Sequence, residues 1–291
     1  MIPASFEYFS PKTLSEAISL LQKHGSDAKI LAGGQSLIPL MKLRLASPSH
    51  LIDLNRISEL SYIKESDGFL TIGALTRESD LDSSELIRKK YPIVADTAAV
   101  IGDPLVRNMA TVGGNLAHAD PANDHPATMM ALGAEVTAAG PKGTRRIKIT
   151  DFFAGLFTTT LRPDEILTEI RIPIPPARSG GSYLKVERKV GDFAAAAVAV
   201  QITLGSGNTC ERVGIGLTNV GQTPIKATRA EKSLQGKAAD EKNIKEAARI
   251  AAEEAEPTED LRGSVAYKRS LIKVLTARAL RQAVARAKGE Q

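Results

Sequence analysis

Apolar residues recur along the chain in two patterns, one typical of helices and one typical of strands. Apolar positions three or four residues apart predict helices, and the clearest stripe is Ile272, Leu275, Ala279 and Ala283. Short apolar runs bounded by glycine, proline or polar residues predict strands. The predicted helices span about 13–25, 37–44, 93–101, 240–255 and 265–288, and the predicted strands span 29–32, 50–54, 68–74, 136–139, 146–149, 166–174, 194–204 and 211–217.

Turn-forming residues separate these elements. Thr13 and Glu16 predict a capping box at the start of the first helix. The segment 102–115 is rich in loop-forming residues. Prolines within 173–176, followed by the sequence Ser-Gly-Gly-Ser at 179–182, predict a linker. We therefore expect a domain boundary near residue 176.

Composition narrows the class of protein. The chain has 291 residues, of which 43% are hydrophobic and 24% charged, which is ordinary for a globular protein. The net charge of +5 permits an acidic ligand without requiring nucleic acid. The longest apolar run, 193–200, is far shorter than the ~20 residues that a membrane span needs. Glu7 and Lys12 interrupt the region where a secretory signal would be apolar, so we expect a cytoplasmic protein that is at most peripheral to the inner face of a membrane.

Cys210 is the single cysteine of the chain. One thiol cannot form an intrachain disulfide, and it cannot supply the thiolate set of an iron–sulfur cluster or a structural zinc site. A redox centre held by this chain must therefore be organic, or must lie in another subunit.

Two segments share a double glycine. The first glycine motif is Leu31-Ala32-Gly33-Gly34-Gln35-Ser36, and the second is Thr111-Val112-Gly113-Gly114-Asn115. Consecutive glycines let backbone N–H groups converge on an anion, and a following helix adds partial positive charge. Each motif alone is typical of a tight turn. Together, with polar neighbours, they predict a site for the two phosphates of a dinucleotide. The Rossmann fingerprint is missing, since Gly-Ile-Gly at 214–216 is better interpreted as part of a strand.

At this point the residues resemble a known family. The sequences at 31–39, 109–115 and 120–124 are similar to those of the FAD-binding medium subunits of molybdenum hydroxylases, which include the carbon monoxide dehydrogenase and xanthine dehydrogenase FAD subunits. The resemblance covers nearly the whole chain. It implies an α+β fold: a two-lobed, vanillyl-alcohol-oxidase-type (PCMH-type) FAD domain at 1–176, with lobes at about 1–57 and 58–176, followed by a small domain at 177–291 with a short antiparallel sheet and helices.

The same resemblance implies a function. The chain would be the non-catalytic electron-transfer subunit of an oxidoreductase, holding non-covalent FAD. Substrate would be oxidised at a molybdenum cofactor in a large subunit, and 2Fe–2S clusters of a small subunit would pass electrons to the FAD, which reduces an external acceptor. We expect two such heterotrimers to form a dimer, and we expect no nucleic-acid partner.

Site residues are assigned by the resemblance, position by position. Asp124 would bind the polar tail of the flavin, although locally it could equally cap the helix before Pro126. Lys185 would stabilise negative charge on reduced flavin, although the residue alone suggests a solvated surface lysine. The complete set of expected cofactor contacts is Leu31, Ala32, Gly33, Gly34, Gln35, Ser36, Leu37, Ile101, Ala110, Thr111, Gly113, Gly114, Asn115, Asp120, Asp124, Leu167, Lys185 and Phe193.

Two positions depart from the family pattern. Gln35 replaces a histidine that relatives often carry, and both side chains can form hydrogen bonds. Phe193 replaces a tyrosine that lies over the flavin, so the ring is kept and the hydroxyl is lost.

Other functions have some support. A self-sufficient flavin oxidase is the main alternative. The stretch 262–288 carries eight Lys or Arg and no acid, which could indicate a nucleic-acid or subunit contact, although a solvated helix is the simpler interpretation. His118 and His125 lie close to acidic residues, but prolines between them argue against a metal site, so none is expected.

Overall fold

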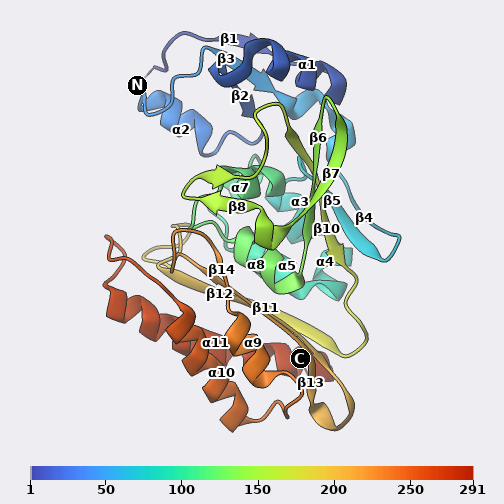
Figure 1. Ribbon diagram of the computed structural model, residues 1–291, viewed down its shortest axis with the longest axis vertical. Coiled ribbons are helices and arrows are strands. Elements are labelled where there is room, and N and C mark those ends of the chain that lie inside the picture. The colour runs from blue at the N-terminus through green and yellow to red at the C-terminus, as the bar shows by residue number, and fades with distance from the viewer. Residues whose placement is uncertain (1, 291) are drawn as a thin grey trace.

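The structure is a computed structural model that describes residues 2–290. The three larger sheets follow one another along the long axis of the molecule in chain order, from the N-terminal lobe at the top of Figure 1 to the C-terminal helices at the bottom. No helix in the described range is long and apolar enough to cross a membrane.

The N-terminal lobe contains a parallel three-stranded sheet of order β1-β3-β2. Ala17 and Leu21 of the first helix pack with Ile52 and Ile57 to form its core. The Thr13 side chain accepts a hydrogen bond from the N–H of Glu16, but the Glu16 carboxylate accepts from Lys12, one residue earlier than a capping box requires. The elements are β1 (Glu7–Phe9), α1 (Leu14–His24), β2 (Ala28–Leu31), α2 (Leu37–Lys42) and β3 (His50–Asp53).

A five-stranded antiparallel sheet of order β4-β5-β10-β6-β7 forms the middle of the molecule. Ile72, Val136 and Ile170 of this sheet share one core with residues of the neighbouring helices. The predicted strands at 136–139 and 146–149 are confirmed as β6 and β7, which pair as an antiparallel hairpin. The strands of this sheet are β4 (Ile63–Ser66), β5 (Phe69–Gly73), β6 (Glu135–Gly140), β7 (Gly143–Lys148) and β10 (Ile166–Pro173). A separate two-stranded sheet pairs β8 (Phe153–Gly155) with β9 (Thr158–Thr159). The helices are α3 (Glu78–Ser83), α4 (Glu85–Lys90), α5 (Pro92–Ala99), α6 (Pro104–Arg107), α7 (Val112–His118) and α8 (His125–Leu132).

The segment 102–115 is not the loop that its composition predicts. It holds α6 and the first turn of α7. Asp103 accepts a hydrogen bond from the N–H of Val106, and Thr111 accepts one from the N–H of Gly114. These caps stabilise two short helices, of which α6 opens with a proline at its favoured first position and α7 contains two glycines of low helix propensity.

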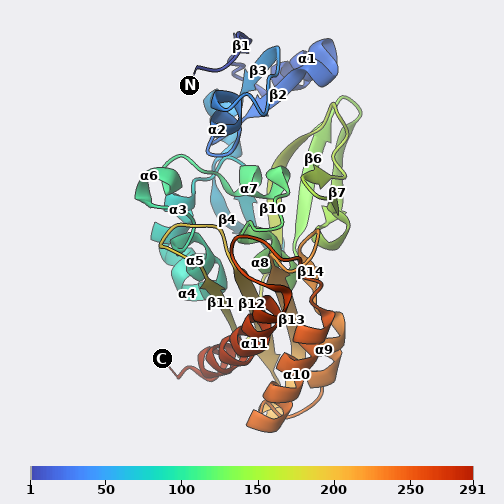
Figure 2. The ribbon, with the colours of Figure 1, turned by 90° about the vertical axis from the view of Figure 1, so that its left-hand side faces the viewer.

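The C-terminal part has an antiparallel sheet of order β11-β12-β13-β14, with helices on both faces. Successive residues of β12 face opposite sides: Ala197 and Ala199 join the core of the middle region, whereas Val198 and Val200 pack toward α10 and α11. Burial on both faces explains the continuous apolar run of this strand. Figure 2 shows α9, α10 and α11 on the outer side. The elements are β11 (Ser179–Val186), β12 (Ala196–Leu204), β13 (Cys210–Thr218), β14 (Ile225–Lys226), α9 (Thr228–Leu234), α10 (Glu241–Glu254) and α11 (Val265–Lys288).

The predicted linker is partly wrong, because Ser179 to Ser182 begin β11. The glycines there serve packing. A Cβ at Gly180 would overlap the backbone carbonyl of Ala283 and lie 2.5 Å from the N atom of Ala287, so glycine lets α11 lie directly on the strand.

Candidate functional site

The two glycine motifs are 80 residues apart in sequence and touch in the fold. A Cβ at Gly33 would overlap the carbonyl oxygen of Met109 and lie 2.7 Å from the Cα of Ala110. A Cβ at Gly114 would lie 3.8 Å from the Cβ of Ala32. Absent side chains therefore allow the N-terminal lobe to meet the middle region along these backbones.

The first glycine motif has backbone donors to offer. Gly34 has φ +75°, a conformation that favours glycine. In residues 2–290, the N–H groups of Gly33, Gly34, Gln35 and Ser36 donate no hydrogen bond to the protein. Four consecutive free donors form a surface suited to an anion.

The second glycine motif has no such supply, contrary to the expectation that both motifs grip phosphate in the same way. Its glycines lie in the first turn of α7. The N–H of Gly113 donates to the carbonyl of Ala74 at 3.0 Å, and the N–H groups of Gly114 and Asn115 donate to Thr111. What this motif does leave is one buried acceptor, because Oδ1 of Asn115 has no partner among the described residues.

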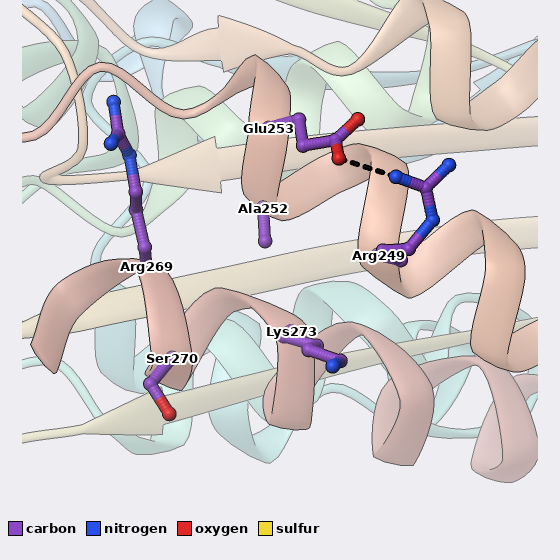
Figure 3. A pocket seen from close by; sticks show the side chains of 6 residues that line it. All are labelled: Arg249, Ala252, Glu253, Arg269, Ser270 and Lys273. Atoms are coloured by element: carbon purple, nitrogen blue, oxygen red, sulfur yellow. Dashed lines mark hydrogen bonds and ion pairs between the residues drawn. The ribbon is translucent and has the colours of Figure 1, made fainter. Parts of the chain in front are cut away.

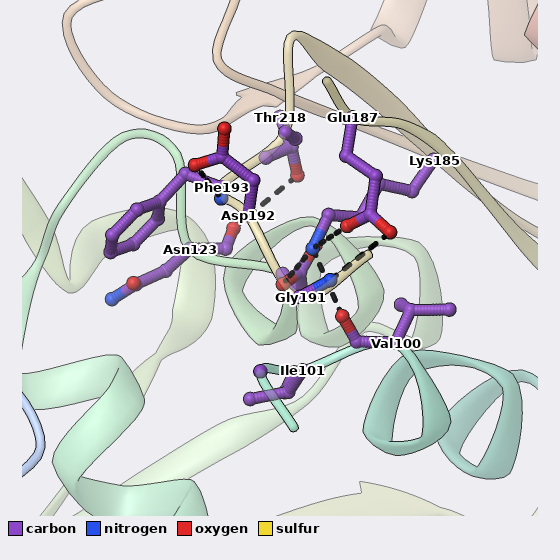
Figure 4. A network of polar contacts seen from close by, with 12 residues as sticks. Val100, Ile101, Asn123, Lys185, Glu187, Gly191, Asp192, Phe193 and Thr218 are labelled. Carbon is purple, nitrogen blue, oxygen red and sulfur yellow. Dashed lines mark hydrogen bonds and ion pairs between the residues drawn. The ribbon is translucent and has the colours of Figure 1, made fainter. Parts of the chain in front are cut away.

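A buried ion pair lies next along the site. One oxygen of Asp124 accepts a 2.5 Å hydrogen bond from the Tyr183 hydroxyl, and the other lies 3.2 Å from Nζ of Lys185. Lys185 also donates to the carbonyl of Val100 at 3.0 Å (Figure 4). The Asp124 and Lys185 side chains are only 6% and 3% exposed. Asp124 therefore does not cap its helix, and Lys185 is not a solvated lysine.

Burial controls the protonation of this cluster. It raises the pKa of Asp124, a shift that the Lys185 ammonium opposes. Burial, with the Asp124 carboxylate beside it, raises the pKa of the Tyr183 hydroxyl well above its usual value. Tyr183 consequently keeps its proton and acts as a donor.

The network continues from Lys185 to the loop after β11. Glu187 lies 3.2 Å from Nζ of Lys185 and accepts a 3.3 Å hydrogen bond from the N–H of Gly191. Gly191 packs against the backbone of Gly102, where its absent Cβ would lie 3.0 Å from the carbonyl carbon. The buried charges thus hold this loop against the residues that follow Ile101.

Phe193 projects from the same loop and is 41% exposed. Asp192 accepts hydrogen bonds at 3.0 Å from both Arg188 and Arg262, and the hydrogen bond from Arg262 is the main cause that lowers the pKa of Asp192 to about 2. The guanidinium of Arg262 also lies over the Phe193 ring, 5.7 Å from its centre. The aromatic ring therefore lies at the protein surface beside the Arg262 guanidinium, which is itself held by Asp192.

The other predicted contacts are buried in cores or form hydrogen bonds within the protein. Ile101 and Leu167 are buried in cores, at 7% and 6% exposure. The carbonyl of Ala110 accepts from the N–H of Glu78, and Asp120 accepts from the N–H of Ala122. Leu31 and Leu37 pack with Met41 and Leu51 in a small cluster of the N-terminal lobe.

Tyr183 and Glu187 are members of the network that sequence reasoning missed. A usable signal exists, because residues 183, 185 and 187 alternate with Leu184 and Val186, which pack in the C-terminal core. Period-two alternation places Tyr183 and Lys185 on the opposite face of the strand, and Glu187 follows directly after its last residue. That face carries the network.

Two other candidate features lie outside this cluster. Of the two histidines near acidic residues, His118 lies with its ring tilted toward Phe157, 5.3 Å between the ring centres, and His125 forms a 2.7 Å hydrogen bond with Glu78. The described residues contain no group of three or more possible metal ligands. A surface groove between α10 and α11 has its Arg249 paired with Glu253 and contains no predicted site residue (Figure 3).

Comparison with known families defines the class of protein. Residues 4–175 match the model of the FAD-binding domain in molybdopterin dehydrogenases, and residues 181–283 match the CO dehydrogenase flavoprotein C-terminal domain. The chain belongs to this family of FAD-binding oxidoreductase subunits. FAD is its cofactor, and the α+β fold expected from the resemblance is confirmed.

Individual relatives cover the full chain. The chain is 45% identical over 288 residues to the carbon monoxide dehydrogenase medium chain of Afipia carboxidovorans, covering 99% of this chain and 100% of that one. It is 39% identical to the glyceraldehyde dehydrogenase medium chain of Sulfolobus acidocaldarius, covering 97% and 99%. A solved carbon monoxide dehydrogenase from Hydrogenophaga pseudoflava, which lacks the Mo-pyranopterin moiety of its molybdenum cofactor, superimposes with a TM-score of 0.95 at 46% identity, covering 98% of this chain and 99% of that one. The relatives are medium chains of multi-subunit enzymes.

Proposed function

We propose that the chain binds FAD along the line of residues described above and acts as the electron-transfer subunit of a heterotrimeric molybdenum hydroxylase. The observation that carries the proposal is the contact between the two glycine motifs, continued by the buried Asp124–Lys185 pair. We further propose domains at 1–176 and 177–291, with lobes at 1–57 and 58–176, and a cytoplasmic location.

The residues present fit FAD. The pyrophosphate is anionic, and the free N–H groups from Gly33 to Ser36 are donors. Ribityl and ribose hydroxyls need acceptors, and the unpartnered Oδ1 of Asn115 and the carboxylate of Asp124 are acceptors. We propose that Leu167, Lys185 and Phe193 line the flavin ring, and that the remaining predicted contacts shape the groove.

When bound, FAD supplies redox chemistry that can join one-electron donors to an external acceptor. The chain's own residues perform the surrounding tasks. Lys185 places a positive charge in a desolvated position, where it favours an anionic form of a neighbouring group. The Phe193 ring would shield the flavin from solvent, and its side chain has no hydrogen-bond donor. Tyr183 keeps Asp124 oriented through its hydroxyl.

Partners must supply the other centres. Because the chain has one cysteine, and Cys210 is buried in the C-terminal sheet, it cannot ligate an iron–sulfur cluster. We propose a large molybdenum-cofactor subunit and a small 2Fe–2S subunit as partners, with two heterotrimers forming a dimer.

The first test measures FAD binding. The purified chain should release FAD on denaturation, and the FAD-depleted chain should rebind it. Asp124→Asn should weaken FAD affinity roughly tenfold or more, since a charged hydrogen-bond partner is lost. Glu165→Gln is the matched control, because Glu165 is also a buried carboxylate, paired at 2.8 Å with Arg145 outside the cluster. Its affinity should match the wild type within about twofold. A wild-type chain that never binds FAD would contradict the proposal.

The second test concerns the division of labour. Co-expression with the large and small subunits should give a complex whose mass corresponds to two heterotrimers and whose iron depends on the small subunit. The isolated FAD-loaded chain should not oxidise aldehydes. Steady oxidation of aldehydes by this chain alone would favour a self-sufficient flavin oxidase.

A further inference from the structure

A continuous line of side-chain hydrogen bonds crosses between the two glycine motifs. Arg77, the N-cap residue of α3, donates from Nη1 to the carbonyl of Met109 and from Nη2 to Oδ1 of Asn55 at 2.6 Å. Asn55 in turn donates from Nδ2 to the carbonyl of Ala32 at 2.9 Å. The line therefore begins one residue before Ala110 and ends one residue before Gly33.

Asn55 is held in the orientation that this line requires. Its backbone N–H and its Nδ2 both donate to Oδ1 of Asp53, at 2.9 and 2.6 Å. Oδ2 of Asp53 accepts a 2.6 Å hydrogen bond from the Tyr8 hydroxyl. The amide group consequently presents its oxygen to Arg77 and its nitrogen to Ala32.

Arg77 is fixed at the other end. Its backbone forms an isolated β-bridge with Thr111, and the N–H of the next residue, Glu78, donates to Ala110 at 3.0 Å. The side chain is partly buried, and desolvation lowers the pKa of its guanidinium. A cation kept in such a place needs its acceptors. One of them, the Met109 carbonyl, lies beside the second glycine motif, and the other, Oδ1 of Asn55, belongs to a side chain that itself donates to Ala32 of the first motif.

We propose that Arg77 and Asn55 are positioning residues that hold the two glycine motifs in register, so that the FAD groove is complete only while this bridge is closed. Gly33 explains why a bridge is needed: at this joint the backbones meet without a side chain, so few packing contacts resist sliding. Fixed hydrogen bonds to the two adjacent carbonyls supply that resistance. The inference rests on the FAD site proposed above.

The test compares two arginines with the same chemistry. Arg77→Met removes the bridge. Arg178→Met removes an arginine that likewise donates to a carbonyl, that of Gly205 at 2.6 Å, and to an asparagine oxygen, that of Asn208 at 2.7 Å, but in the C-terminal part. We expect the FAD dissociation constant to rise roughly tenfold in Arg77→Met and by less than about twofold in Arg178→Met.

A second readout does not depend on FAD. Hydrogen exchange of the apoprotein should become faster in Arg77→Met at Glu78, Met109, Ala110 and Val112, whose N–H groups are hydrogen-bonded beside the joint, with exchange in the C-terminal sheet unchanged. Arg178→Met should leave exchange at these four residues as in the wild type. If the wild-type chain binds no FAD, the proposed function fails, and the exchange data alone decide whether the bridge exists.

A double-mutant cycle separates a bridge from two independent contacts. Asn55→Ala should weaken FAD binding as much as Arg77→Met, and the double variant should be no weaker than either single variant, because each breaks the same line. Asn55→Asp keeps an acceptor for Arg77 but loses the donor to Ala32 and sets a second carboxylate against Asp53, so it should weaken FAD binding at least as much as Asn55→Ala. Additive effects, or wild-type affinity and exchange in Arg77→Met, would overturn the proposal.

Discussion

The two Gly-Gly pairs have the same sequence but differ in backbone conformation and hydrogen bonding. The pair at 33–34 follows a strand, includes a residue at φ +75°, and lies in a segment whose N–H groups are free. The pair at 113–114 lies inside the first turn of α7, where Thr111 and Ala74 accept hydrogen bonds from its N–H groups. The first pair therefore leaves backbone donors available to a ligand, whereas the donors of the second pair are bonded within the protein.

What the pairs share is close approach. Gly33 lies against the backbone of Met109, and Gly113 lies against Ala74, where a Cβ would come within 2.5 to 2.8 Å of three atoms. A double glycine therefore indicates contact between backbones in both places. Whether it also indicates an anion site depends on where the neighbouring N–H groups donate, which the local sequence does not determine.

The largest effect should come from Gly113→Ala. Its Cβ would meet the Cα, Cβ and carbonyl oxygen of Ala74, which are fixed in a fully buried region, so overpacking should lower the free energy of unfolding by about 3 kcal/mol. Urea denaturation of the apoprotein measures this. Gly155→Ala is the control, because a Cβ there has nothing within 4 Å, and its change should stay within about 0.5 kcal/mol. Equal stability of the two variants would remove the packing role of the second pair.

Gly33→Ala should act mainly on binding. The new methyl group must push the first glycine motif away from Met109 and Ala110, which separates the motifs without disturbing a core. We expect FAD affinity to fall by about 2 kcal/mol, close to thirtyfold, with a smaller change in unfolding free energy. FAD titration and urea denaturation on the same sample give the ratio. A larger loss of stability than of affinity would reverse the comparison between the two pairs.

Much of the fold follows from periodicity. The helices α1, α10 and α11 and the hairpin of β6 and β7 are long or strongly patterned, so local sequence predicts them well. The helix at Val112–His118 was missed because two glycines lower its propensity, and its stability comes from the Thr111 cap and from packing. The prediction of a linker at 179–182 was partly wrong for a similar reason, because Gly180 lies in a strand and its missing side chain lets α11 pack directly on it.

The residues of the site were harder to predict from the sequence around each of them. Asp124 and Lys185 are 61 residues apart in sequence, and the residues next to each of them do not indicate that the two form an ion pair. Their assignment came from resemblance to a family. Asn55 and Arg77 carry no motif at all, because their partners are carbonyl groups of distant backbone, and any residue has a carbonyl.

The cap of α7 gives an intermediate effect. Thr111→Ala removes the acceptor for the N–H of Gly114 and should cost about 1 kcal/mol of stability, whereas Thr111→Ser keeps the hydroxyl and should recover most of it. Thermal or urea denaturation distinguishes the variants. If Thr111→Ala weakened FAD binding far more than stability, and serine restored it, the hydroxyl would serve the ligand directly and the second pair would resemble the first.

Gln35 should give the smallest effect. Its side chain is exposed, and what the first glycine motif offers an anion at this position is the backbone N–H, which every residue except proline possesses. Gln35→Ala should therefore change FAD affinity by less than about 0.5 kcal/mol, and Gln35→His should do the same. The comparison is sharpest at this position, because Gln35→Pro removes the N–H donor that alanine keeps, and its ring also fixes φ and restricts the preceding Gly34. Proline should weaken FAD binding clearly more than alanine in the same titration. Equal losses for alanine and proline would mean that the side chain, and not the free backbone, makes the first pair a binding site.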